Sequence, residues 1–293
     1  MRENIAMHFV QAKGILSQNN GMNIYRGCSH GCIYCDSRSK CYGFTHAFED
    51  IEVKENAPEL LEQALRSKRH KCMIGTGAMC DPYLPAEKEL QLTRKCLELI
   101  DRYEYGVTVL TKSNLVLRDL DLLQSIHKKT KAVVQMTLTT YDENLCRKLE
   151  PNVSTTRERF EVLMRCKELG IPTLVWMTPI LPFINDTREN IEGLLDYCLQ
   201  AGVQGILVFD VGVTLREGDR EYFYQALDRD FPGIRQKYVS TYGNAYDIPS
   251  PHTKELMALI QNTCTANGIL CSPKECFTYL HEFPERYVQQ TLF

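Results

Sequence analysis

The sequence has 293 residues, of which 44% are hydrophobic and 24% charged, and its formal net charge is −3. This composition is that of an ordinary globular protein with a large core, and it excludes a disordered chain. The acidic balance excludes recognition of polyanions by bulk charge, so any nucleic-acid site must be a local patch.

The N-terminus and the apolar runs predict a cytoplasmic protein without a membrane span. The first residues, MRENIAMHFVQAKG, lack the apolar region of a signal peptide. The longest apolar run, residues 171–184, is interrupted by three prolines. Structural disulfides are rare in the cytosol, so some of the 13 cysteines are expected to serve metal or redox chemistry.

Short apolar strands alternate along the chain with longer helical periods. The predicted strands are Met22–Tyr25, Cys72–Thr76, Gly106–Leu110, Ala132–Leu138, Pro172–Met177 and Gly205–Phe209. The predicted helices are Pro58–Ser67, Pro85–Tyr103, Val116–Lys128, Thr155–Leu169 and Thr187–Ala201. This alternation predicts a parallel sheet with right-handed crossovers, either an incomplete barrel or a doubly wound sheet.

We favour one α/β fold, a partial (β/α)6 TIM-like barrel with a C-terminal helical cap. Residues 1–210 are predicted to form the barrel, and residues 211–293 the cap and a tail packed on it. In barrels of this kind the chemistry lies on the loops that follow the strands.

Four cysteines crowd the loop after the first predicted strand, in the segment RGCSHGCIYCDSRSKCYG. Cys28, Cys32 and Cys35 have the spacing C-x3-C-x2-C. Three thiolates on a tight loop can each bind one iron of a 4Fe–4S cluster, which leaves the fourth iron without a protein ligand. The alternative is tetrahedral zinc with His30 or Cys41 as the fourth ligand.

The segment NIYRGCSHGCIYC resembles the signature of the radical SAM superfamily, C-x3-C-x-aromatic-C, with Tyr34 as the aromatic residue. Further segments resemble the branch of this superfamily that is related to spore photoproduct lyase. They are AKGIL at 12–16, CDPYLPAE at 80–87, LTKS at 110–113 and PILPFINDT at 179–187. The resemblance follows the strand order, so it is far more specific than a single motif.

This resemblance implies a 4Fe–4S cluster bound by Cys28, Cys32 and Cys35, with S-adenosylmethionine (SAM) held at the open iron. One electron from the cluster would cleave SAM to a 5′-deoxyadenosyl radical, which takes a hydrogen atom from the substrate. The barrel positions the cofactor and excludes water. An electron donor such as flavodoxin or ferredoxin is the implied partner.

The resemblance also assigns SAM contacts. The assigned residues are Tyr34, Thr76, Gly77, Ala78, Lys112, Thr137, Thr139 and Ile180. The Tyr34 backbone and Ile180 would contact the adenine, and the end of the second strand would contact the amino group. That strand end reads Thr-Gly-Ala here and departs from the usual Gly-Gly-Glu. Lys112 would pair with the SAM carboxylate. The two threonines would bind the ribose, or serve only as strand formers.

Cys80 is the candidate catalytic thiol, because spore photoproduct lyase is similar in having a cysteine near its second strand that returns a hydrogen atom. The alternative is a passive thiol. An auxiliary cluster is a further hypothesis for Cys264, Cys271 and Cys276, although their spacing lacks a C-x2-C pair.

The C-terminal region carries two signals. Its tyrosines either stack on bases of single-stranded nucleic acid or bridge the core and solvent of a helical cap, and the cap is favoured. The last five residues, Gln289 to Phe293, read QQTLF and resemble the peptides that dock on the bacterial sliding clamp. The alternative is a tail that packs on the domain.

These observations predict a radical SAM enzyme that acts on nucleic acid, in repair or modification similar to that of the photoproduct lyase. A second hypothesis gives the same radical chemistry a peptide or small-metabolite substrate. A third is a zinc-stabilised binding module without enzymatic activity.

Overall fold

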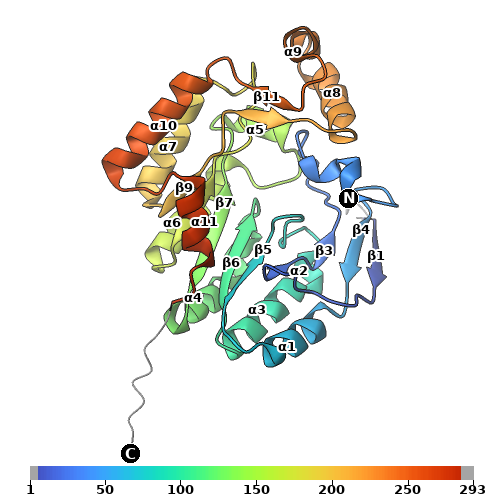
Figure 1. Ribbon diagram of the computed structural model, residues 1–293, viewed down its shortest axis with the longest axis vertical. Coiled ribbons are helices and arrows are strands. Elements are labelled where there is room, and N and C mark those ends of the chain that lie inside the picture. The colour runs from blue at the N-terminus through green and yellow to red at the C-terminus, as the bar shows by residue number, and fades with distance from the viewer. Residues whose placement is uncertain (1–5, 285–293) are drawn as a thin grey trace, which may run out of the picture.

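The computed structural model describes residues 6–284, and its centre is a six-stranded sheet (Figure 1). The strands are β2 (Gly21–Met22), β5 (Met73–Thr76), β6 (Gly106–Thr111), β7 (Ala132–Thr137), β8 (Thr173–Trp176) and β9 (Gly205–Leu207). Neighbouring strands pair in parallel and in chain order. A doubly wound sheet reverses its order at a switch point. The unbroken order is that of a partial barrel, so the predicted α/β fold is confirmed.

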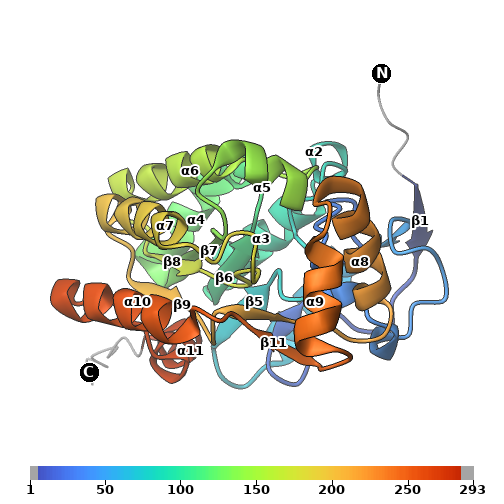
Figure 2. The ribbon, with the colours of Figure 1, turned by 90° about the horizontal axis from the view of Figure 1, so that it is seen from above.

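Helices follow the strands and pack along the outside of the sheet (Figures 1 and 2). They are α1 (Ala57–Ser67), α2 (Glu87–Leu90), α3 (Leu92–Arg102), α4 (Leu120–Lys129), α5 (Glu143–Leu149), α6 (Thr156–Glu168) and α7 (Arg188–Ala201). Every residue of β7 is buried, as expected for a central parallel strand that is covered on both faces. Thr155 and Glu158 form a capping box that fixes the start of α6.

The predicted helix Pro85–Tyr103 is wrong in one respect, because it is broken at Gln91 into α2 and α3. Gln91 has a φ of 52°, in the left-handed region. The buried Glu87 carboxylate accepts hydrogen bonds from the backbone N–H groups of Leu92 and Thr93, at 3.1 and 3.0 Å. Glu87 therefore caps α3 and replaces the helical bonds that the break removes.

A second, three-stranded sheet was not predicted. Its strands are β1 (Met7–Val10), β4 (Ile51–Lys54) and β3 (Tyr25–Arg26), with β4 in the middle. The predicted strand Met22–Tyr25 is consequently divided between two sheets. Because β3 leads directly into the cysteine loop, this small sheet supports the base of that loop.

The C-terminal region adds β10 (Gly212–Thr214), α8 (Asp219–Asp230), α9 (Ile234–Tyr242), β11 (Asp247–Pro249), α10 (Thr253–Asn267) and α11 (Pro273–His281). Phe223 and Tyr238 of α8 and α9 share an apolar cluster with Cys32, Ile33 and Tyr34 of the cysteine loop. Helix α10 instead packs on α7, and α11 packs on β9. The helices α8 and α9 thus cover the cysteine loop. The helices α10 and α11 continue the outer layer of the sheet.

The tyrosines of this region differ in exposure. Tyr238 is fully buried and donates a hydrogen bond to Pro182 O at 2.9 Å, and Tyr224 is also buried. Such side chains serve the packing of the cap. Tyr246 is exposed, so it alone among these three retains a face for a ligand.

Two predictions remain, one about the C-terminal tail and one about membrane spans. The clamp-like segment Gln289 to Phe293 lies outside the described residues, and clamp docking stays a prediction. Within residues 6–284, none of the helices is long and apolar enough to cross a bilayer.

Candidate active site

The cysteine loop begins with a turn that only glycine fits. Gly27 has a φ of 88°, and a Cβ atom there would lie 2.6 Å from Phe48 O. The backbone N–H of Cys28 donates to the same carbonyl at 3.0 Å. The first cysteine is therefore held by the backbone of the segment before β4.

The three predicted ligand cysteines open into one cavity of about 260 Å³. Its lining includes nine of the predicted site residues: Cys28, Cys32, Tyr34, Cys35, Gly77, Ala78, Cys80, Lys112 and Thr137. These residues come from the cysteine loop and from the C-terminal ends of β5, β6 and β7. Chemistry at the C-terminal ends of barrel strands is the expected placement.

Gly77, at the end of β5, brings backbone atoms into this cavity. Its φ is 100°, and a Cβ atom would lie 1.9 Å from Leu110 O at the end of β6. No side chain fits there, so the strand end presents the Gly77 and Ala78 backbone to a ligand. Backbone atoms can replace the carboxylate that the usual Gly-Gly-Glu would supply to an ammonium group.

Cys80 and Asp81 connect the second strand end to its neighbours. The Cys80 thiol is buried and donates to Gly27 O at 2.7 Å. The Asp81 carboxylate accepts hydrogen bonds from Thr111 Oγ1 and from the backbone N–H of Lys112, both at 2.7 Å. Asp81 therefore fixes the loop that carries Lys112, a role that the segment CDPYLPAE does not reveal by itself.

A buried charge network supports the floor of the cavity. Glu150 Oε2 accepts from Arg159 Nη2 at 2.5 Å, and its Oε1 lies 3.1 Å from Lys112 Nζ. The Tyr34 hydroxyl donates to the same carboxylate. Burial alone would raise the pKa of Glu150, but the charges of Arg159 and Lys112 and the Tyr34 hydrogen bond outweigh it and lower the pKa to about 2. Glu150 is thus ionised and holds Lys112 at the edge of the cavity.

Three predicted SAM contacts lie outside the cavity lining. Thr76 is a buried residue of β5, and Ile180 is fully buried in the core. Thr139 is also fully buried, and its carbonyl accepts hydrogen bonds from Asn185 and Asn190 at 2.8 and 2.9 Å. The structure instead brings Trp176 and Thr178, which were not predicted, to the cavity wall.

The donor set suits a 4Fe–4S cluster. In the described part of the chain, the sulfur atoms of Cys28, Cys32 and Cys35 do not all lie within 4.8 Å of one another. A single zinc ion would need them about 3.8 Å apart, from Zn–S bonds of about 2.3 Å. A cluster takes one thiolate on each of three irons and tolerates a wider spread. Cys41 is exposed, and its Sγ contacts Arg216 rather than the cavity.

The three cysteines of the C-terminal region lie in the apolar core or are packed against it. Cys276 is buried in an apolar cluster beneath β9, with Leu174 and Leu207. Cys264 belongs to the main apolar core, and Cys271 is partly buried against it. Their environment favours packing over an auxiliary cluster.

A second cavity, of about 580 Å³, adjoins the first and shares Tyr34, Cys35 and Thr178 with it. Its other walls come from the loop after β9 and from β10 and β11. Asp36, Asp210 and Asp247 also contribute to its lining. The volume is within the range of small-molecule sites.

Comparison with known sequences agrees with this site. The model of the radical SAM superfamily matches residues 22–198, more than half of the chain. An uncharacterized protein of Mycobacterium bovis is 29% identical over 249 residues, covering 80% of this chain and 70% of that protein. An uncharacterized protein of Methanocaldococcus jannaschii is 34% identical over 169 residues, covering 57% of this chain and 62% of that protein.

Comparison with solved structures shows the same fold. Spore photoproduct lyase complexed with dinucleoside spore photoproduct matches with a TM-score of 0.64 and 13% identity, over 90% of this chain and 81% of that chain. A variant of that lyase with bound AdoMet and dinucleoside spore photoproduct gives a TM-score of 0.61 and 14% identity, over 86% and 75% of the two chains.

Proposed function

The chain belongs to the radical SAM superfamily, and from this premise we propose that it reductively cleaves SAM at a 4Fe–4S cluster bound by Cys28, Cys32 and Cys35. The observation that carries the proposal is the single cavity into which these thiols open together with the Gly77 backbone and Lys112. Family membership implies an enzyme with a cluster and SAM.

When bound, the cluster supplies the electron that converts SAM to methionine and a hydrogen-abstracting 5′-deoxyadenosyl group. The chain's own residues hold the reactants. Lys112, fixed by Glu150 and by Asp81, offers a compact positive charge to the SAM carboxylate. The backbone carbonyl groups around Gly77 offer hydrogen-bond acceptors to the amino group of SAM. The apolar wall of Trp176 and the cap helices keep water away.

We propose nucleic acid as the substrate class, with a base or base pair entering the 580 Å³ cavity. The support is the fold likeness to a lyase complexed with a dinucleoside photoproduct, together with a substrate-sized cavity beside the cofactor cavity. Enzymes that act on a base take it out of the stack into such a pocket. Repair or modification of DNA is the corresponding activity.

A second candidate is a cationic peptide or amine metabolite. Asp36, Asp210 and Asp247 line the substrate cavity, and carboxylates repel phosphate and attract ammonium groups. The Arg216 guanidinium lies 3.4 Å from Asp36 and offsets part of this charge. Asp210 and Asp247 are exposed and have no ion pair in the described part of the chain.

Salt dependence separates the two candidates. If the substrate is nucleic acid, the affinity of the reconstituted protein for UV-irradiated oligonucleotides is expected to fall at least tenfold between 50 and 200 mM salt, by about 10³-fold for six phosphate contacts. An Asp210→Asn, Asp247→Asn variant would bind these oligonucleotides at least as well. Oligonucleotide binding that is undetectable at 50 mM salt, together with binding of a lysine-rich peptide that is lost in this variant, would favour the cationic substrate.

Cys80 is proposed to return a hydrogen atom to the product radical, because its thiol lines the cofactor cavity. Replacing Cys80 by alanine is expected to keep formation of 5′-deoxyadenosine within about threefold and to lower the yield of product per 5′-deoxyadenosine at least tenfold. In D₂O, wild-type product would carry one deuterium from the exchangeable thiol. A Cys80→Ala variant with unchanged product yield and unchanged deuterium content would assign Cys80 to packing alone.

A further inference from the structure

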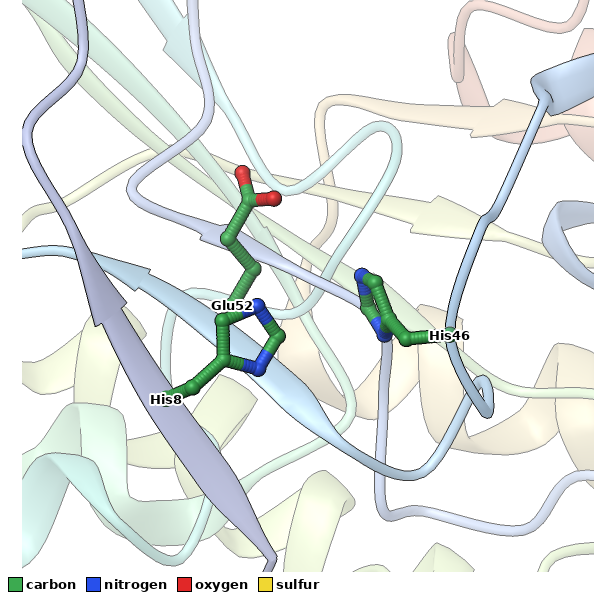
Figure 3. Close-up of side chains that lie close together, drawn as sticks. All are labelled: His8, His46 and Glu52. Atoms are coloured by element: carbon green, nitrogen blue, oxygen red, sulfur yellow. The ribbon is translucent and has the colours of Figure 1, made fainter.

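We propose that His8, His46 and Glu52 form a second metal site, separate from the cysteine loop, for a divalent transition-metal ion of which Zn²⁺ is the representative. One ligand atom from each of these side chains lies within 4.8 Å of the other two. Figure 3 shows the three side chains gathered beside β1 and β4. Among the described residues, this is the one group of histidine, cysteine and carboxylate side chains that meets this criterion.

The backbone brings the ligands together from three segments. His8 in β1 and Glu52 in β4 are direct partners in the parallel pairing of these strands, so their side chains leave the sheet on the same face. His46 comes from the loop between Gly43 and Asp50. Its ring packs edge-on against His8, with the centroids 4.8 Å apart, and against Phe44 at 5.6 Å. The fold therefore brings together three residues from separate segments, and they are not simply neighbours in the sequence.

Both imidazoles retain a nitrogen atom for an ion. His46 Nδ1 lies 2.9 Å from Ala47 O, and since a carbonyl only accepts, this nitrogen carries the proton. His8 Nδ1 lies 3.1 Å from Asp50 Oδ2, but it is buried and makes no hydrogen bond within residues 6–284. His46 therefore offers Nε2 to an ion, and the His8 ring retains an unpartnered nitrogen. A backbone carbonyl that fixes the tautomer of one ring, as Ala47 O does for His46, is characteristic of metal-binding histidines.

The Glu52 carboxylate has a cationic neighbour, Lys54, but no direct contact with it. Within residues 6–284 it makes no hydrogen bond or ion pair, although it is half-buried. Arg26 is its pairing neighbour on β3, but the Arg26 guanidinium donates to Tyr42 O and Gly43 O and lies over the Phe44 ring. The Lys54 ammonium donates to Asn23 O instead, so a bound cation would be the direct counter-charge of Glu52.

The ligand set decides the class of metal. Two histidines and one glutamate are a ligand set used for zinc, which binds at about 2.0–2.2 Å and often keeps a fourth position for water. Imidazole also excludes Mg²⁺ and Ca²⁺ as preferred ions, since these take oxygen ligands. Tetrahedral ligands lie about 3.3 Å apart, so binding draws the three side chains together from the 4.8 Å that encloses them now.

Metal binding at this position would brace the cysteine loop. The ion would connect β1, β4 and the segment that contains Phe48, whose carbonyl accepts from the Cys28 N–H. His8 is 38% exposed, which leaves the site open to ions from solvent. The inference concerns metal binding by these side chains and is independent of the substrate proposed above.

The test is zinc binding by the full-length chain in which Cys28, Cys32 and Cys35 are all replaced by alanine, so that the cysteine loop cannot take the ion. Titration against a chromophoric zinc chelator is expected to show one Zn²⁺ per chain with a dissociation constant of 1 μM or tighter. His46→Ala and Glu52→Gln in the same background should weaken binding at least 30-fold. His70→Ala, which changes an exposed histidine elsewhere, should leave it unchanged.

A second measurement covers the case in which the triple variant does not fold. Co²⁺ added to the wild-type chain with its cluster in place should give visible d–d absorption without a sulfur-to-cobalt charge-transfer band, and Glu52→Gln should abolish that absorption. Zinc binding that is absent, or that survives both His46→Ala and Glu52→Gln, would overturn the proposal. A cobalt spectrum with the charge-transfer band would also overturn it, because the ion would then be on thiolates.

Discussion

Replacing Cys32 by alanine is expected to abolish both cluster binding and formation of 5′-deoxyadenosine from SAM. Cys32 is one of the three predicted ligand thiols on the cofactor cavity, and it is 6% exposed beneath the cap, so water does not readily replace it. Loss of a group that only orients a metal ligand costs about 10- to 100-fold. Loss of the ligand itself should therefore cost more than about 100-fold, measured as 5′-deoxyadenosine formed per chain with dithionite as reductant.

The matched control is Cys41→Ala, in the same loop. Cys41 is exposed and does not line the cavity, so iron content and 5′-deoxyadenosine formation should stay within about twofold of the wild type. If Cys41→Ala were as damaging as Cys32→Ala, the fourth cysteine would be a ligand and the zinc hypothesis would regain support.

The largest effect on stability is expected at Arg159. Its guanidinium is fully buried and pairs with Glu150 at 2.5 Å, and it also donates to Thr137 O at 3.0 Å. Arg159→Met keeps an unbranched apolar stem but removes the guanidinium, which leaves Glu150 paired with Lys112 alone. Removing one partner of a buried pair costs about 3–5 kcal/mol. Urea denaturation of the apo chain at pH 7 would measure this loss.

The control on the same helix is Arg157→Met. Arg157 is exposed and lies 3.6 Å from Glu161 in an i,i+4 pair, so its loss should change the free energy of unfolding by less than about 0.5 kcal/mol. If Arg159→Met were no worse than Arg157→Met, the buried network would not support the floor of the cavity.

The pH dependence of this prediction has a definite sign. Burial alone would raise the pKa of Glu150, but Arg159 and Lys112 lower it to about 2, below the unfolded value of about 4.3. The Glu150 contribution to stability is therefore complete above pH 4.3 and is lost as pH falls toward 2. In Arg159→Met the Glu150 carboxylate, left with Lys112 alone, would be protonated more readily. The difference between wild type and variant should therefore be largest near neutral pH and shrink below about pH 4.

The central part of the fold was predictable because its signals are local. The strands β5 to β9 are short apolar runs, each separated from the next by helical periods, and parallel strands in chain order follow from that alternation. The cysteine spacing and the first predicted strand placed the loop at the correct end of the sheet. Most of the predicted cofactor contacts reach the cavity because strand ends in a barrel meet at one face.

The features that were missed depend on contacts between distant segments. Nothing local in MHFV or IEVK shows that β1 and β4 pair, because strands of four residues carry too little pattern. Tyr34 and Glu150 are 116 positions apart, so their hydrogen bond appears only in the folded chain. The break at Gln91 depends on a side chain, Glu87, that competes with the helix for its N–H groups.

Anaerobic reconstitution of the wild-type chain, followed by an assay for 5′-deoxyadenosine from SAM and dithionite, tests the proposed activity most directly. The proposal predicts about four irons and four sulfides per chain, with 5′-deoxyadenosine formed in amounts that rise with cluster content. A chain that binds zinc but no iron at Cys28, Cys32 and Cys35, and that leaves SAM intact, would contradict it.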